Sequence, residues 1–166
     1  MISDMKKVGD WVYATGDYVI AGNDTNSGKS FVNGISAWNG TSWRKFGLGL
    51  RKKSLKNLYD APIGYSLALL PDSSLLVSGE FDLFDTVACR NLVRLTPSGN
   101  VEPFGFAPAD TLSRNCKVYT FGDTIIVVGQ FTHIGGKEIA NMAIYDGKDW
   151  MPLTYNASNT TIYDIV

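Results

Sequence analysis

A glycine-rich segment, GNDTNSGKS at residues 22–30, comes nearest in residue types to a phosphate-binding loop. A loop of that kind has four residues between its glycines and opens a helix whose N-terminal N–H groups hold the phosphates. Here five residues separate Gly22 from Gly28, and the following FVNGI is a poor helix start. Asp24 and Asn26 also suggest part of a calcium loop, but the acid that completes that motif is missing. We therefore expect a solvated loop.

Three acids, Glu80, Asp82 and Asp85, lie close enough in sequence to do acid–base chemistry or to hold a cation. Glu80, however, stands at a position that the repeat described below fills elsewhere with Asp17 and Gln130. A position that accepts an amide does not depend on charge. We expect these acids to be structural.

The single histidine, His133, has no second histidine or cysteine nearby to share a metal, and no nucleophile-elbow motif is present. Cys89 and Cys116 match no metal-binding spacing, and we expect two small buried side chains, with a disulfide as the alternative. The sequence therefore predicts a protein that is not an enzyme and has no cofactor or metal site.

A run of basic residues is the one strong local charge in a chain of net charge −1. It consists of Arg44, Lys45, Arg51, Lys52, Lys53 and Lys56. A solvated connector is one interpretation, and a docking surface for an acidic partner is the other. Without interleaved aromatic residues the run does not predict nucleic-acid binding.

Apolar residues make up 45% of the chain, enough for a sizeable core, and charged residues 19%. No apolar run approaches the roughly 20 residues that cross a bilayer as a helix, so we expect no membrane span. Residues 1–10 contain no apolar stretch of the signal-peptide type.

The sequence contains an internal repeat with a period near fifty residues. A repeat of this length indicates the fold of the chain. Each copy has a glycine, an acid or amide, and an aromatic residue at the end of an apolar run. An asparagine then opens a second run, which closes in a turn. Two copies place a tryptophan three residues beyond the turn's glycine. The repeat positions are Gly16, Tyr18, Asn33, Gly40 and Trp43; Gly79, Phe81, Asn91 and Gly99; and Gly129, Phe131, Asn141, Gly147 and Trp150.

Each repeat predicts four short antiparallel strands, which is one blade of a β-propeller. The turns at Asn39-Gly40, Ser98-Gly99 and Asp146-Gly147 are typical of hairpins in which both central residues have positive φ. The expected strands are 2–8, 11–18, 34–38 and 43–48; 65–70, 74–81, 91–96 and 101–106; and 116–121, 124–131, 141–145 and 150–155.

The domain organisation predicted from these strands is all-β. Blade 1 covers residues 1–50, a connector 51–64, blade 2 65–107 and blade 3 108–156. Residues 162–166 are similar to residues 2–5, so 157–166 are expected to start a fourth blade. Closed propellers have at least about four blades. Either several copies close a ring or, as we favour, the chain is a segment of a longer one.

The repeat units resemble known propeller repeats over nearly the whole chain. GISAWNGTSW at residues 34–43 and NMAIYDGKDW at residues 141–150 are similar to kelch-like blades. Such blades occur in fungal cortical polarity markers, bacterial surface proteins and phage structural proteins. LLVSGEF at residues 75–81, with NLVRLTPSG at residues 91–99, resembles the delta-60 repeat. Blade 2 departs from the pattern by having Val101 near the place of the tryptophan.

The resemblance implies a fold and leaves the task open, because one fold serves many functions. We expect a non-catalytic structural and interaction module of a phage or virus particle, such as a tail or fibre component. A cell-surface or cortical polarity protein is the second interpretation, and a glycan-binding or carbohydrate-active propeller the third. The expected partners are other protein subunits, the rest of a longer chain, or a surface glycan.

Overall fold

The computed structural model describes residues 1–21, 30–53, 61–105 and 114–153. These residues form strands, turns and loops, with no helix among them and hence none that could cross a membrane. Residues 22–29 of the glycine-rich segment, Lys56 and the predicted fourth-blade strand at 157–166 lie outside the described residues.

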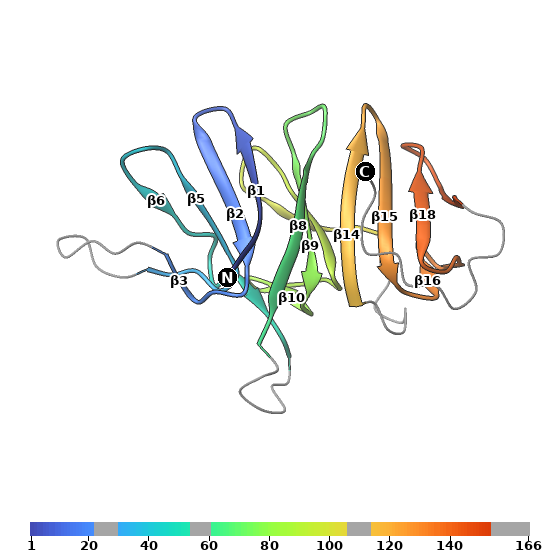
Figure 1. The fold of residues 1–166 in the computed structure, drawn as a ribbon, viewed down its shortest axis with the longest axis horizontal. Helices are drawn as coiled ribbons and strands as arrows, with labels where there is room; N and C mark the ends of the chain where they lie inside the picture. The colour runs from blue at the N-terminus through green and yellow to red at the C-terminus, as the bar shows by residue number, and fades with distance from the viewer. Residues whose placement is uncertain (22–29, 54–60, 106–113, 154–166) are drawn as a thin grey trace.

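Three four-stranded antiparallel sheets confirm the predicted blades. Blade 1 has the order β1-β2-β5-β6, blade 2 β13-β12-β9-β8 and blade 3 β14-β15-β18-β19. The blades stand side by side in chain order, with blade 1 and blade 3 at opposite ends (Figure 1). Their bounds are β1 Ile2–Val8, β2 Trp11–Gly16, β5 Ile35–Trp38 and β6 Trp43–Arg44; β8 Ile63–Leu69, β9 Leu75–Glu80, β12 Leu92–Leu95 and β13 Val101–Pro103; β14 Arg114–Phe121, β15 Thr124–Gln130, β18 Met142–Tyr145 and β19 Trp150–Pro152.

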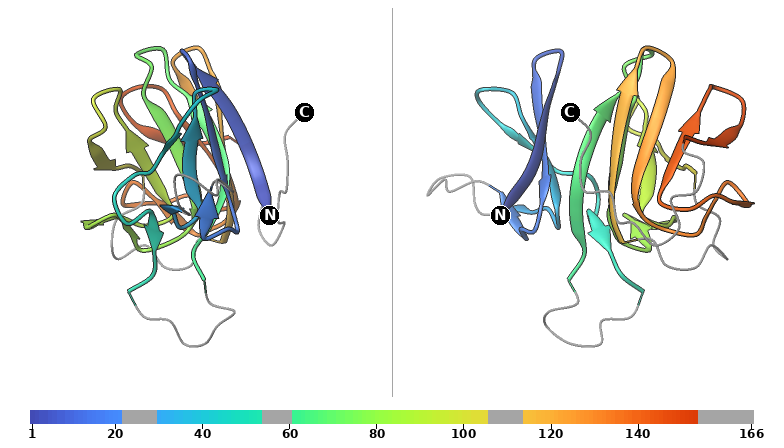
Figure 2. Two further views of the ribbon diagram at one scale, coloured as in Figure 1. Left: turned by 90° about the vertical axis from the view of Figure 1, so that its left-hand side faces the viewer. Right: turned by 45° about the vertical axis from the view of Figure 1, so that its right-hand side comes forward.

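Each blade also carries a small hairpin between its second and third strands, at the lower end of the blades in Figure 1 and in the right-hand view of Figure 2. The strands of these hairpins are β3 Ile20–Ala21 and β4 Ser30–Phe31; β10 Leu83–Phe84 and β11 Val87–Ala88; and β16 His133–Ile134 and β17 Lys137–Glu138. A further strand, β7 Leu50–Arg51, leaves blade 1 and pairs with β10 of blade 2. The predicted connector at 51–64 therefore begins and ends in strands, since β8 starts at Ile63.

The outermost strand of blade 1 is shorter than the predicted 43–48 and ends at Arg44. Gly47 and Gly49 have φ of 54° and 71°, a left-handed backbone that cannot continue an extended strand. This bend turns the chain toward blade 2, where β7 begins.

The hydrophobic core lies between the blades, in two separate clusters. Strand β9 of the central blade shows why, because successive side chains of a strand point to opposite faces. Leu75 and Val77 pack in the cluster shared with blade 1, and Leu76 packs in the cluster shared with blade 3. The central blade is thus covered on both faces, and β9 begins with an unbroken apolar run, Leu75–Val77.

The repeated glycines are needed for close strand approach. A Cβ atom on Gly16 would lie 2.1 Å from the carbonyl oxygen of Met1, and one on Gly79 would lie 2.1 Å from that of Ile63. On Gly129 it would lie 2.8 Å from the Cα of Cys116. Opposite these glycines the pairing with the first strand of each blade is irregular. These three glycines lie at or next to the ends of strands.

The repeated asparagine bends the chain in a left-handed conformation. Asn91 and Asn141 have φ of 57° and 65°, and the N–H of each donates to the carbonyl of Phe81 or Phe131 at 3.0 Å. In blade 1 the N–H of Gly34 makes this bond, to Tyr18 at 2.7 Å. The register agrees, since Ile35 pairs opposite Thr15 as Leu92 does opposite Ser78. Gly34, and not the predicted Asn33, is therefore the equivalent residue.

The hairpin turns between the third and fourth strands differ from the predicted type. In Asn39-Gly40 and Asp146-Gly147 only the glycine has positive φ, at 96° and 94°. The side chain of the residue before the glycine stabilises the turn instead, by accepting hydrogen bonds from the backbone. Asn39 Oδ1 accepts from the N–H groups of Thr41 at 3.0 Å and Ser42 at 2.8 Å.

Asp146 forms the same turn in blade 3. Its Oδ1 accepts from the N–H groups of Asp149 at 2.8 Å and Lys148 at 2.9 Å, and these bonds lower the pKa of the Asp146 carboxyl. In blade 2 the turn is one residue longer, and Thr96 takes this role by accepting from the N–H of Asn100 at 3.0 Å.

We expect Gly79→Ala to lower the free energy of unfolding by about 1–3 kcal/mol, the usual cost of forcing atoms into a packed site. The added methyl group would collide with backbone, which cannot turn aside as a side chain can. Urea unfolding followed by circular dichroism measures the loss. Gly122→Asn is the control, because a Cβ there meets nothing within 4 Å and asparagine tolerates the positive φ. Equal effects of the two variants would contradict the steric account.

Candidate functional site

The innermost strands of blades 1, 2 and 3 are β1, β8 and β14. Two side chains on β1 and β8 join neighbouring blades by accepting hydrogen bonds from backbone N–H groups. Asp4 Oδ2 of β1 accepts from the N–H of Leu67 in β8 at 2.8 Å. Ser66 Oγ of β8 accepts from the N–H of Val118 in β14 at 2.7 Å. Asp4 and Ser66 hold the same place in their blades, since they pair opposite Thr15 and Ser78. We call these two bonds the inter-blade bridges.

The bridge between blades 2 and 3 belongs to a buried hydroxyl network. Ser78 Oγ donates its hydrogen to the carbonyl of Cys116 at 2.7 Å, so the Ser66 hydroxyl donates to Ser78 at 2.8 Å. The Ser66 Oγ, whose hydrogen is donated to Ser78, accepts the hydrogen bond from the N–H of Val118. Both serines are buried, and each hydrogen has an acceptor. Such a network fixes the position of the two blades because any shift leaves a buried polar group unpaired.

An open cavity of about 360 Å³ lies along the three innermost strands. Its lining residues come from all three blades and include the polar and aromatic residues Asp4, Lys6, Tyr65, Lys117 and Tyr119. In a propeller the innermost strands face the central axis. This axial groove has both signs of charge, and its Asp4 and Ser66 are already engaged in the inter-blade bridges.

The predicted basic run and the predicted acidic cluster meet each other in space. Lys52 Nζ lies 2.9 Å from Glu80 Oε1, and the Lys52 side chain is only 11% exposed. The hydroxyl of Tyr65, in the axial groove, donates to Glu80 Oε2 at 3.2 Å. The N–H of Lys53 donates to Asp82 Oδ2 at 3.2 Å. These contacts join the end of blade 1 to blade 2, so this part of the run is not a solvated connector.

Two further members of these clusters have conformational or packing roles. Asp85 has a left-handed φ of 53°, like Gly135 at the equivalent place in blade 3, which has φ of 62°. The Oδ1 of Asp85 accepts a hydrogen bond from the N–H of Leu48 at 3.0 Å. The Arg44 guanidinium lies 5.2 Å from the ring centre of Phe46, a cation–π distance. Lys45 and the side chain of Lys53 are exposed. Docking of an acidic partner on the basic run stays a prediction.

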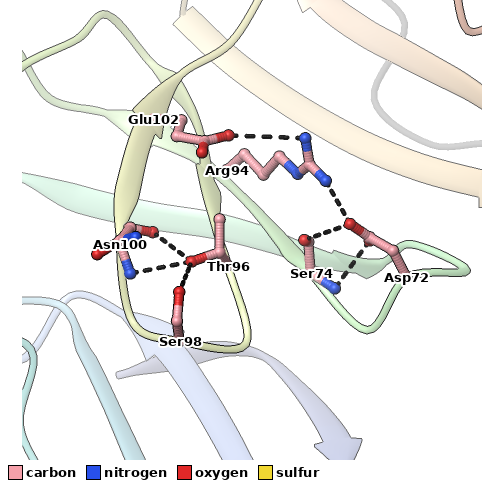
Figure 3. Close-up of polar contacts among 7 residues, drawn as sticks. All are labelled: Asp72, Ser74, Arg94, Thr96, Ser98, Asn100 and Glu102. Carbon is pink, nitrogen blue, oxygen red and sulfur yellow. Dashed lines mark hydrogen bonds and ion pairs between the residues drawn. The ribbon is translucent and has the colours of Figure 1, made fainter.

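A second ionic cluster joins β12 and β13 of blade 2 to the turn between β8 and β9 (Figure 3). Arg94 donates to Asp72, and its Nη1 lies 3.6 Å from Glu102 Oε2. The N–H of Ser74, at 3.0 Å, is the main cause that lowers the pKa of the Asp72 carboxyl. These charges are partly exposed, and such pairs contribute little to stability. They connect the turn between β8 and β9 to β12.

The groups that could do chemistry stay separate in the described part of the chain. His133 is half-buried in β16 and bonds through Nδ1 with Thr132 Oγ1 at 3.0 Å. Cys116 is buried and Cys89 is half-buried, both as free thiols, and desolvation by burial raises the pKa of Cys89 to about 12. No three histidine, cysteine or acidic side chains among the described residues are grouped to hold a metal.

The face of blade 1 that points away from blade 2 is exposed and apolar. Met5 is 58% exposed, while Leu67, at the same place in blade 2, is 2% exposed against blade 1. Trp43 is 43% exposed, while Trp150, its equivalent in blade 3, is 6% exposed. We call this surface the open face. It holds an apolar pocket of about 420 Å³, lined by Met1, Ile2, Ala14, Tyr18, Ile20, Ala21, Ser36 and Trp43.

A comparison with family models supports the architecture. A model described as a beta-propeller domain of unknown function (DUF5122) matches residues 70–104, which run from the end of β8 to just past β13. The three sheets are propeller blades. The match spans most of one blade and brings no function with it. No curated protein matches the chain.

Sequence reasoning found the repeat residues but not the inter-blade bridges or the open face. Asp4 and Ser66 differ in residue type, so no repeat of letters marks them. Met5 and Leu67 are both apolar in the sequence, and only the number of neighbouring blades makes one exposed and the other buried.

Ser66→Ala is expected to lower the free energy of unfolding by about 1–3 kcal/mol, because it leaves the buried N–H of Val118 without its acceptor. Chemical unfolding monitored by circular dichroism would show the change. Ser98→Ala, in the exposed turn of blade 2, is the matched control and should change stability by about 0.5 kcal/mol or less. A loss no larger than that of the control would mean that the bridge does not hold the blades.

Proposed function

We propose that this chain is a non-catalytic structural and interaction module that uses its open face to join a larger assembly. The observation that carries the proposal is the exposure of Met5 and Trp43 at the places where Leu67 of blade 2 and Trp150 of blade 3 are buried. Apolar patches of this kind on a folded surface are typical of interaction sites. The basic residues 51–53 serve the fold through their contacts with blade 2, which leaves the open face as the better supported docking surface.

We expect Met5→Lys to change the free energy of unfolding by about 0.5 kcal/mol or less, and Leu67→Lys, at the equivalent place in blade 2, to lower it by more than about 4 kcal/mol. The first lysine stays in water and the second is buried without a partner. Urea unfolding of both variants makes the comparison.

Dye binding provides the second measurement. The hydrophobic dye ANS should bind the folded wild type and bind the Met5→Lys/Trp43→Lys variant less, with unchanged circular dichroism. If Met5→Lys is as damaging as Leu67→Lys, the chain itself covers the open face and the proposed function fails.

Within this class we place the chain first in a phage or virus particle, as a tail or fibre-associated component, and second in a cell-surface or cortical polarity protein. The support is the resemblance of its repeats to blades of such proteins. Free thiols and a low cysteine content accord with either placement.

Glycan binding without catalysis is a second candidate, favoured by the exposed Trp43. Its ring lies 5.1 Å from that of Trp38, and paired indoles can stack on sugar rings. We expect Trp43→Ala to abolish any binding of the chain to a glycan array, while Trp150→Ala would act only through folding. An array on which the folded wild type binds no glycan would exclude this candidate.

A further inference from the structure

Each of the first two blades sends a phenylalanine into the blade that follows it. Phe46 comes three residues after Trp43, and Phe104 three residues after Val101, which is the equivalent of Trp43. A glycine with positive φ follows each phenylalanine, with φ of 54° at Gly47 and 78° at Gly105. The shared Phe-Gly bend directs the ring across the gap between blades.

Both rings are built into the inter-blade cores. Phe46 packs edge-on against Phe84 of blade 2, with ring centres 6.4 Å apart. Phe104 packs edge-on against Tyr145 and Trp150 of blade 3, at 5.5 and 5.9 Å. Contacts of this geometry add to the burial of the ring itself.

The pocket of the open face is the blade 1 counterpart of the surfaces that receive these rings. Counting from the repeated glycines, Ala21 holds the place of Phe84 in blade 2 and of Ile134 in blade 3. By strand register, Trp43 holds the place of Trp150. The residues that line the pocket are smaller at several of these places than those of blade 2, and the resulting space of about 420 Å³ is wide enough for a large aromatic side chain.

Two hydroxyls in the pocket already have partners. Tyr18 donates to the carbonyl of Ala14 at 2.6 Å, and Ser36 Oγ lies 3.0 Å from the Tyr18 oxygen. Burial raises the pKa of Tyr18, so its hydroxyl stays neutral. An apolar side chain can therefore cover this pocket without leaving a polar group unpaired.

We propose that the pocket of the open face receives the phenylalanine of a Phe-Gly bend from a blade of the same repeat type that lies outside these 166 residues. The incoming ring would pack edge-on against Trp43, as Phe104 does against Trp150. This inference rests on the proposed function, since it names the partner of the same face.

A second copy of the chain is a poor source of this ring. The residue three places after Trp150 is Leu153, an aliphatic side chain that is 39% exposed. Blade 3 also has Lys117 at the place where Asp4 and Ser66 supply the acceptor of the inter-blade bridges, and an ammonium group cannot accept a hydrogen bond. Blade 3 thus has neither the ring nor the acceptor.

The test adds a copy of residues 1–62 ahead of Met1 and leaves the native chain whole. The Phe46 of the added blade then has the pocket within reach. We expect a higher melting temperature than that of the native chain, most of which is lost when Phe46→Ala is introduced in the added copy alone. A melting temperature that does not respond to this substitution would overturn the proposal.

A second measurement keeps the inference testable if the extended chain does not fold. The peptide NVEPFG, which copies residues 100–105, is titrated into the native chain and followed by NMR. Shifts should gather at Ala14, Ala21 and Trp43. They should be lost with a peptide in which Phe104 is replaced by serine, and in the Ala21→Phe protein, whose pocket is filled. Shifts elsewhere, or equal shifts with the serine peptide, would contradict the proposal.

Light scattering distinguishes a second copy of the chain from a blade outside these 166 residues as the source of the ring. A dimer of the native chain that dissociates on Leu153→Ser would assign the pocket to a second copy and overturn the inference. The proposed function fails separately, through the comparison of Met5→Lys with Leu67→Lys. If that comparison holds and Phe46→Ala has no effect, the open face binds a partner but the partner brings no aromatic ring.

Discussion

A four-stranded blade has two apolar faces, and it can bury them only against other blades. Every other feature of this chain depends on that constraint. The central blade satisfies it on both sides, and its two faces form the two hydrophobic clusters of the structure. Blade 1 satisfies it on one side only, which leaves Met5 and Trp43 exposed. Equivalent apolar residues therefore form a core in one blade and an exposed surface in another.

Polar contacts decide how the blades are placed once the apolar faces meet. Burial of apolar surface has no direction, so it would allow neighbouring blades to slide. The inter-blade bridges of Asp4 and Ser66 remove that freedom, because each satisfies a backbone N–H at one position only. The pairing of Lys52 with Glu80 adds a second fixed point between blades 1 and 2.

Several acids and bases of the described residues make contacts that hold the fold together. Glu80 is engaged by Lys52 and Tyr65, and Asp85 holds the backbone of Leu48. Groups held in such contacts are positioned for packing. The open face adds an apolar surface with a pocket and the exposed indole ring of Trp43.

The sequence by itself determined the blades, because a glycine, an aromatic residue and a turn at a fixed spacing are local requirements of a four-stranded unit. It also predicted which repeat residues would be structural. It misplaced Asn33 by one residue, since only strand register shows that Gly34 makes the bend. Nothing in the sequence indicated that the basic run contacts the acids. The two groups lie about thirty residues apart in sequence, but Lys52 and Glu80 lie within 3 Å of each other in space. Only the tertiary structure decided which faces are covered, because the exposure of an apolar residue depends on the blade beside it and not on its own strand.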